Sequence, residues 1–211
     1  MTTHWDLISQ LGDSRLLLPI SATLIGAGLW QRHQWAGRWA IALSAVFLIV
    51  LASKLAFLGW GMGIARLDFT GFSGHAAMSA LTWPVVLTLI RRKAGSRKWT
   101  VAAGLLLAAA VGYSRLPLNT HAWSEVAGGF LLGAGSAAAI TSRMDYPLRI
   151  NREWVVAALL AGACLAIATR EAHTHQVVVK LAKKLSGNVK EFKRDILFQK
   201  LPRGNDPNSR T

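Results

Sequence analysis

The chain has 211 residues, of which 52% are hydrophobic and 16% are charged, and its formal net charge at pH 7 is +14. Soluble domains usually carry about 25% charged residues, so this composition disfavours a soluble domain and predicts that much of the chain faces lipid. The single cysteine, Cys164, excludes an intramolecular disulfide bond.

Residues 1–15 are predicted to form a short interfacial N-terminal segment, because apolar residues recur at helical spacing from Trp5 to Leu11. We do not expect a cleavable signal peptide. Asp6 and Asp13 stand where such a peptide carries basic residues, and further apolar blocks follow.

Six apolar blocks follow this segment. They are Leu16–Trp30, Trp39–Ala56, Gly74–Ile90, Trp99–Tyr113, Val126–Ile140 and Trp154–Thr169. Several are shorter than the roughly 20 residues that a spanning helix needs, but flanking Trp, Tyr, Ser and Gly tolerate the membrane interface and extend them. None shows the polar stripe of an amphipathic helix. The sequence therefore predicts an all-α fold, an integral membrane six-helix bundle over residues 16–169.

The basic residues are concentrated on one side of this topology. Three connections on that side carry ten Lys and Arg, namely Arg32, Arg38, Arg91, Arg92, Lys93, Arg97, Lys98, Arg143, Arg149 and Arg152. The opposite side, before the final tail, carries Arg15, Arg66 and Arg115. By the positive-inside rule the first side is cytoplasmic. Membrane topology thus accounts for the positive charge, and no nucleic-acid partner is expected.

Residues 170–211 are predicted to form a basic C-terminal tail. Apolar residues recur at near-helical spacing between Val177 and Val189, with lysines between them. Two interpretations remain open: a helix that lies on anionic headgroups, or a solvated tail with a partial helix. The last ten residues are predicted to be disordered. With six spans, the tail emerges on the non-cytoplasmic side despite its ten Lys and Arg against four acidic residues.

Polar residues that are costly at membrane depth gather on the non-cytoplasmic side of the six helices. Such residues are functional candidates by default. They are Lys54, Arg66, Ser73, His75, Arg115, His121 and Glu125, and Gly74 lies between Ser73 and His75. Three segments far apart in the sequence are thus expected to meet at one rim.

This set suits phosphoryl transfer, in which charge spreads over three phosphoryl oxygens and requires cations and N–H donors. Lys54 and Arg115 supply the cations. The Ser73 hydroxyl and the Gly74 backbone N–H supply donors at the start of a helix, where the helix dipole favours an anion.

Two histidines divide the covalent work: one attacks phosphorus and the other protonates the departing oxygen. A nucleophilic imidazole needs a partner on its second nitrogen. Glu125 follows His121 by four residues, on the same face if a helix begins there. This spacing predicts His121 as the nucleophile and leaves His75 as the acid.

The segment Ser114-Arg115-Leu-Pro-Leu-Asn-Thr-His121-Ala-Trp-Ser-Glu125 resembles the third signature of the type 2 phosphatidic acid phosphatase superfamily, Ser-Arg, five residues, His, three residues, Asp. Phe72-Ser-Gly-His75 resembles its second signature, Pro-Ser-Gly-His. The resemblance covers about residues 5–169. It implies a helical bundle that hydrolyses phosphate esters or anhydrides through a phosphohistidine, with no metal and no cofactor.

The chain departs from this family at three places. Glu125 replaces the aspartate and adds one methylene, and Phe72 replaces the proline of the second signature. The first signature, Lys, six residues, Arg-Pro, is absent. Lys54 fits its lysine, but Gly61 stands at the position of the arginine. Arg66, twelve residues after Lys54, is the nearest substitute.

The sequence thus predicts a lipid phosphatase of a bacterial inner membrane, with its active site on the periplasmic or external face. Undecaprenyl pyrophosphate is the leading substrate, while phosphatidylglycerol phosphate, phosphatidic acid and lipid A phosphate remain open. Membrane lipids are the expected partners. Two alternatives remain: a lipid phosphotransferase that uses the same site, or a non-enzymatic membrane protein with a degenerate site.

Overall fold

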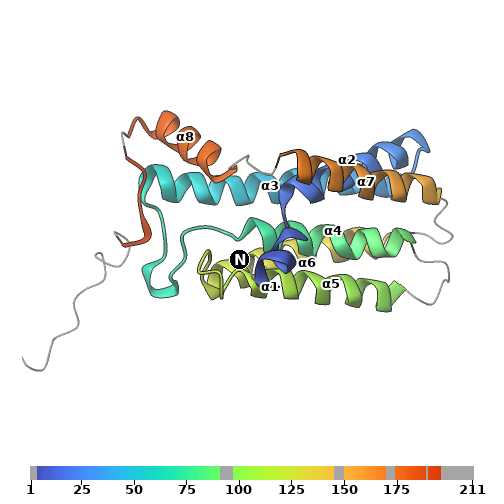
Figure 1. Cartoon of the computed structure of the whole chain (residues 1–211), viewed down its shortest axis with the longest axis horizontal. Helices are drawn as coiled ribbons and strands as arrows, with labels where there is room; N and C mark the ends of the chain where they lie inside the picture. The colour runs from blue at the N-terminus through green and yellow to red at the C-terminus, as the bar shows by residue number, and fades with distance from the viewer. Residues whose placement is uncertain (1–3, 91–96, 145–149, 170–173, 189, 196–211) are drawn as a thin grey trace, which may run out of the picture.

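The computed structural model describes residues 4–90, 97–144, 150–169, 174–188 and 190–195 (Figure 1). These residues confirm the all-α class. The α-helices are α1 (His4–Gln10), α2 (Ser14–Trp30), α3 (Gln34–Trp60), α4 (Gly74–Ile90), α5 (Arg97–Ser114), α6 (Trp123–Thr141), α7 (Arg152–Ala168) and α8 (Thr174–Ser186), and a short 3-10 turn, η1, spans Ala65–Leu67.

The six predicted apolar blocks correspond to α2 to α7. The largest difference is at α3, which begins five residues before the predicted block and continues to Trp60. It ends at Gly61, whose left-handed backbone (φ 66°) lets its N–H bond to the carbonyl of Phe57. The start of α2 is fixed by Asp13, whose side chain accepts the backbone N–H of Arg15 at 2.9 Å.

The long helices run roughly parallel to the longest axis of the molecule (Figure 1). In that view α2, α3 and α7 lie above α4, α5 and α6, and α4 packs against both α5 and α6. The core between these groups is apolar. Its fully buried side chains include Leu17, Leu24, Trp39, Leu81 and Val85.

The contact between α4 and α6 depends on a small residue. A Cβ added to Gly133 of α6 would stand 2.1 Å from the carbonyl oxygen of Ala77 in α4, far closer than atoms allow. The two backbones therefore touch at this point. This close approach brings the first turns of α4 and α6 together, which matters for the site described below.

The helix ends gather at two ends of the molecule (Figure 1). At one end, Arg38 of α3 donates to the Arg143 carbonyl at 3.5 Å, and Arg97 of α5 donates to the Ser142 carbonyl at 3.3 Å. The α3–α4 and α5–α6 connections lie at the opposite end, as the predicted topology requires. The described basic residues of the predicted cytoplasmic loops are thus separated from the polar clusters.

Of the helices in the described ranges, α3 has the length and apolar composition to cross a membrane, whereas α4 and Glu153–Ala168 are apolar but shorter. Large apolar side chains nevertheless face outward on several helices. Ile41 of α3 is 73% exposed and Leu131 of α6 is 69% exposed.

Both terminal segments are helical and pack on the bundle. α1 lies against α5, where the rings of Trp5 and Tyr113 are 5.4 Å apart. α8 lies along α3 and buries Ala182 against Gly59. The tail helix therefore forms, with Leu185 exposed on its outer side. The final ten residues, for which disorder is predicted, lie outside the described residues.

We expect Gly133→Ala to lower the free energy of unfolding by about 1–3 kcal/mol, because its methyl group overpacks the α4–α6 contact. Gly135→Ala, on an open face of the same helix, is the matched control. It should be neutral or raise stability by up to about 1 kcal/mol, since alanine favours a helix. Thermal unfolding of the purified variants measures both effects. A Gly133→Ala protein as stable as the parent would contradict this account of the packing.

Candidate active site

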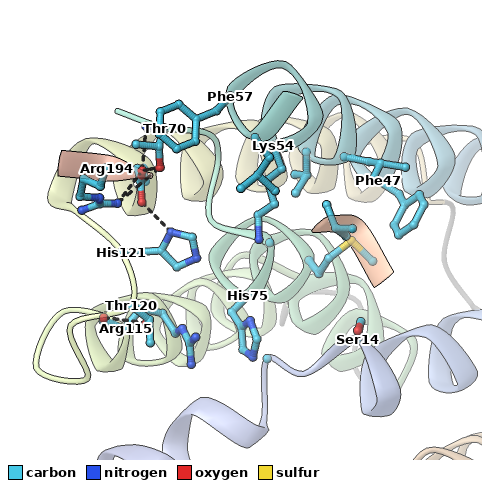
Figure 2. Close-up of a pocket in the computed structure, with 18 of the residues that line it drawn as sticks. Ser14, Phe47, Lys54, Phe57, Thr70, His75, Arg115, Thr120, His121 and Arg194 are labelled. Carbon is cyan, nitrogen blue, oxygen red and sulfur yellow. Dashed lines mark hydrogen bonds and ion pairs between the residues drawn. The ribbon is translucent and has the colours of Figure 1, made fainter. Parts of the chain in front are cut away.

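A cavity of about 690 Å³ lies between α3, α4 and the start of α6. α8 and the segment that follows it also line this cavity (Figure 2). Its polar residues include Asp13, Lys54, Thr70, His75, Arg115, His121, Glu125 and Arg194. The structure thus brings together six of the eight residues predicted for the site, Gly74 among them.

His121 and Glu125 form the predicted pair. The Nδ1 atom of His121 lies 2.6 Å from Oε2 of Glu125. Since a carboxylate only accepts hydrogen bonds, we assign the proton to Nδ1, which leaves Nε2 with a free electron pair. Figure 2 shows the His121 ring on the same side of the cavity as the tip of Lys54, whereas the His75 ring points away from both in this view. All three residues line the cavity.

The Glu125 carboxylate is fully buried and accepts several further hydrogen bonds. Oε1 accepts the backbone N–H of Thr70 at 2.8 Å and its hydroxyl at 2.5 Å, and it pairs with Arg194 at 2.9 Å. Oε2 also accepts the N–H of Ala122 at 3.2 Å, which caps the start of α6. Both oxygens are therefore held, and the orientation of the carboxylate toward His121 is fixed.

The start of α4 lies beside this pair. The backbone N–H of Ser73 donates to the Glu125 carbonyl at 3.0 Å, so α4 and α6 begin next to each other. The Ser73 side chain is fully buried and accepts the N–H of Ala76 at 3.5 Å. It therefore caps α4 and does not line the cavity, whereas Gly74 and His75 do.

Lys54 and Arg115 reach the cavity from different elements (Figure 2). Arg115 donates through Nη1 to the hydroxyl of Ser9, while its Nε atom is buried without a hydrogen-bond partner in the described part of the chain. The α3–α4 connection passes close to Lys54 at Gly71, a position whose φ of 144° favours glycine. A Cβ there would lie 3.2 Å from the Lys54 backbone nitrogen.

Arg66 lies in η1 and is exposed, and it does not line the cavity. Its neighbour Asp68 has a positive φ of 48° and pairs with Arg194 at 3.1 Å. The structure therefore does not bring Arg66 to the other predicted site residues.

The cavity residues that were not predicted from the sequence include Asp13, Thr70 and Arg194. Asp13 had a usable signal, because an acidic residue directly before an apolar helix is a typical N-cap. Burial opposes its ionisation, but hydrogen bonds from Arg15 outweigh this effect and hold its pKa below the usual range. Thr70 and Arg194 have no comparable signal, since neither lies at a helical spacing from Glu125.

Part of the cavity wall is apolar. Phe47, Val50 and Leu51 of α3, Met78 of α4 and Val178 of α8 all line it. The cavity therefore offers space for an apolar group as well as an anion. Among the described residues, no group of three or more His, Cys, Asp and Glu is placed to bind a metal ion.

Most residues of this site lie in the part of the chain that matches one family model. Residues 20–149 match the family model of the PAP2 superfamily. An "Uncharacterized 22.5 kDa protein in cps region" of Klebsiella pneumoniae is 44% identical over 158 residues, which cover 72% of this chain and 76% of that protein. No solved structure matches the chain. The family match includes Lys54, His75, His121 and Glu125, whereas Arg194 lies beyond its end.

We expect the pKa of His121 to lie below the usual 6.5, because burial disfavours the charged ring more than its hydrogen bond to Glu125 favours it. Glu125→Gln removes the charge that favours protonation and should lower this pKa further. Histidine NMR during a pH titration measures both values. Glu153→Gln, an exposed change on α7, is the control. A His121 pKa that rises in Glu125→Gln would contradict this arrangement.

Proposed function

The chain belongs to the PAP2 superfamily of type 2 phosphatidic acid phosphatases, and we propose that it is a membrane lipid phosphatase that works through a phosphohistidine on His121. The observation that carries this proposal is the His121–Glu125 pair. It leaves an unprotonated Nε2 beside a cavity that Lys54 and Arg115 also line.

In the first step, the free electron pair of His121 Nε2 attacks the phosphorus of the substrate. A P–N bond forms while the bond from phosphorus to the leaving oxygen breaks; this oxygen belongs to the lipid alcohol in a monophosphate and bridges the two phosphorus atoms in a pyrophosphate. His75 donates a proton to that oxygen, and Glu125 stabilises the positive charge of the substituted ring. In the second step, water attacks phosphorus and gives its proton to His75. Inorganic phosphate leaves, and Nε2 is free again.

Positive groups around the cavity stabilise the charge that develops on the phosphoryl oxygens. Lys54 lines the cavity from α3, and Arg115, which follows α5, lines it with a second positive charge. The N-terminus of α4 begins at Gly74 on the same wall and adds backbone N–H groups and the positive end of its dipole. Lys54, Gly74 and Arg115 belong to the predicted phosphate site, whereas Ser73 and Arg66, which were also predicted, do not line the cavity.

The apolar wall of the cavity supports a lipid substrate. A phosphate bound near Lys54 leaves its organic group beside Phe47, Leu51 and Val178. Burial of a hydrocarbon chain there is favourable. We propose undecaprenyl pyrophosphate as the leading substrate, and phosphatidylglycerol phosphate, phosphatidic acid and lipid A phosphate as the other candidates.

We further propose that α2 to α7 cross a bacterial inner membrane with the site on the periplasmic or external face. Outward-facing apolar side chains such as Ile41 and Leu131 support contact with lipid. The end that carries Arg38, Arg97 and Arg143 lies opposite the site and suits the cytoplasmic side. α2, α4 and α7 have 17 residues each, or about 25 Å of helix, and need extension through their flanking interfacial residues.

Phosphate release from undecaprenyl pyrophosphate by detergent-purified protein in EDTA tests the activity. We expect His121→Ala to reduce it about a thousandfold or more, because the nucleophile is removed. His33→Ala, at the other end of the molecule, should retain it. Acid-labile, base-stable labelling of the protein by radioactive substrate would report the phosphohistidine directly.

The substrate panel decides between the alternatives. If the phosphate of the substrate is transferred to an added acceptor lipid and is not released as inorganic phosphate, the protein is a phosphotransferase. No reaction with any of the four lipid phosphates, with or without acceptor, would count against an enzyme.

Phe47→Ala tests the lipid wall. We expect it to raise KM about 3- to 10-fold for a long-chain lipid phosphate, because the loss of apolar contact costs about 1 kcal/mol. KM for a short, water-soluble phosphate ester should not change. Leu48→Ala is the matched control, since Leu48 is the next residue of α3, is exposed and does not line the cavity. Equal effects on both substrates would exclude a chain-binding role for Phe47.

A further inference from the structure

The segment that follows α8 folds back onto the cavity. The Asn188 side chain donates to the Gly59 carbonyl at 2.7 Å, and the Phe192 backbone N–H donates to the Leu58 carbonyl at 3.0 Å. These hydrogen bonds attach residues 190–195 to the end of α3 that borders the site.

Arg194 extends from this segment to the buried carboxylate (Figure 2). Its Nη2 atom lies 2.9 Å from Glu125 Oε1 and 3.4 Å from Thr70 Oγ1, and its Nη1 atom lies 3.1 Å from Asp68 Oδ2. The side chain is 35% exposed, while that of Glu125 is 0% exposed. Arg194 therefore spans from the surface to the least accessible charge of the site.

The two oxygens of Glu125 have separate partners. Oε2 holds His121, whereas Oε1 is held by Thr70 and Arg194. A buried carboxylate needs such donors and a nearby positive charge. The negative charge of Glu125 would also repel an incoming phosphate, and the positive charge of the Arg194 guanidinium offsets that repulsion. Without Arg194, Thr70 alone would hold Oε1 among the described residues.

This cation comes from outside the part of the chain that the family match covers, which ends at residue 149. Within the matched part, Gly61 stands where the first family signature has its arginine, and Arg66 does not line the cavity. The C-terminal segment therefore supplies a charge that the matched region does not bring to Glu125.

We propose that residues 191–194, which line the cavity, are part of the active site and that Arg194 is a positioning residue. It holds Glu125 in the orientation in which Glu125 fixes the His121 ring. This inference rests on the proposed function, in which the same pair carries the reaction. Arg194 differs in role from Lys54 and Arg115, which face the phosphate itself.

Steady-state kinetics of full-length Arg194→Ala, Arg194→Lys and Lys190→Ala test this role. We expect Arg194→Ala to reduce kcat about 10- to 100-fold, the range typical of residues that orient a catalytic group, with KM changed less than about threefold. Arg194→Lys should recover part of kcat. Lys190→Ala, an exposed change on the same segment, should match the parent. Unchanged or increased kcat in Arg194→Ala would overturn the proposal, and increased kcat would instead indicate an inhibitory segment.

A second readout does not depend on turnover. Removal of Arg194 acts on His121 through Glu125, because it leaves the carboxylate charge uncompensated and loosens the hydrogen bond that raises the pKa of His121. The pKa of His121 should therefore shift in Arg194→Ala and stay constant in Lys190→Ala. The other charged or titratable groups that line the cavity with His121 are the same in both variants, and they include Glu125, Lys54, Arg115, His75, Asp13, Glu191 and Lys193. Histidine NMR measures this change even if the protein hydrolyses none of the lipid phosphates. In that case the proposed function is wrong, while the positioning role of Arg194 is still tested by the pKa. An unchanged pKa in Arg194→Ala would overturn the positioning role.

Discussion

The arrangement of the site depends on one buried carboxylate. Glu125 has no exposed surface, so its charge is stable only where donors and a positive group surround it. Those partners come from three connections: Thr70 from the α3–α4 connection, His121 and Ala122 from the chain before α6, and Arg194 from the C-terminal segment. Compensation of a single charge therefore couples the positions of segments that are distant in the sequence.

Helix packing explains why this carboxylate lies beside the other reactive groups. The backbones of α4 and α6 touch at Gly133, and the Ser73 N–H bonds to the Glu125 carbonyl where both helices begin. His75 in the first turn of α4 and the His121–Glu125 pair at α6 are thereby brought to one cavity. Two helix N-termini point their partial positive charges toward this region, which suits the binding of an anion.

The combination of an anion site and an apolar wall is consistent with a substrate that is polar at one end. The cavity lies between α3 and α4 and extends to α8, so the same helix that carries Lys54 also presents Phe47 and Leu51. Along a helix, residues three and four apart share a face. α3 therefore lines both the polar and the apolar part of the cavity with one side of its surface.

The sequence by itself determined the helices and the central pair. Long apolar runs bounded by polar residues encode α2 to α7 locally. The four-residue spacing also predicted the contact of His121 with Glu125, but α6 begins at Trp123, so His121 precedes the helix and Glu125 meets it while accepting the N–H of Ala122. The tertiary structure alone decided which cations surround that pair. Lys54 and Arg115 line the cavity and Arg66 does not, while Arg194 reaches Glu125 across 69 residues. Such contacts arise from the packing of whole segments, and no local spacing records them.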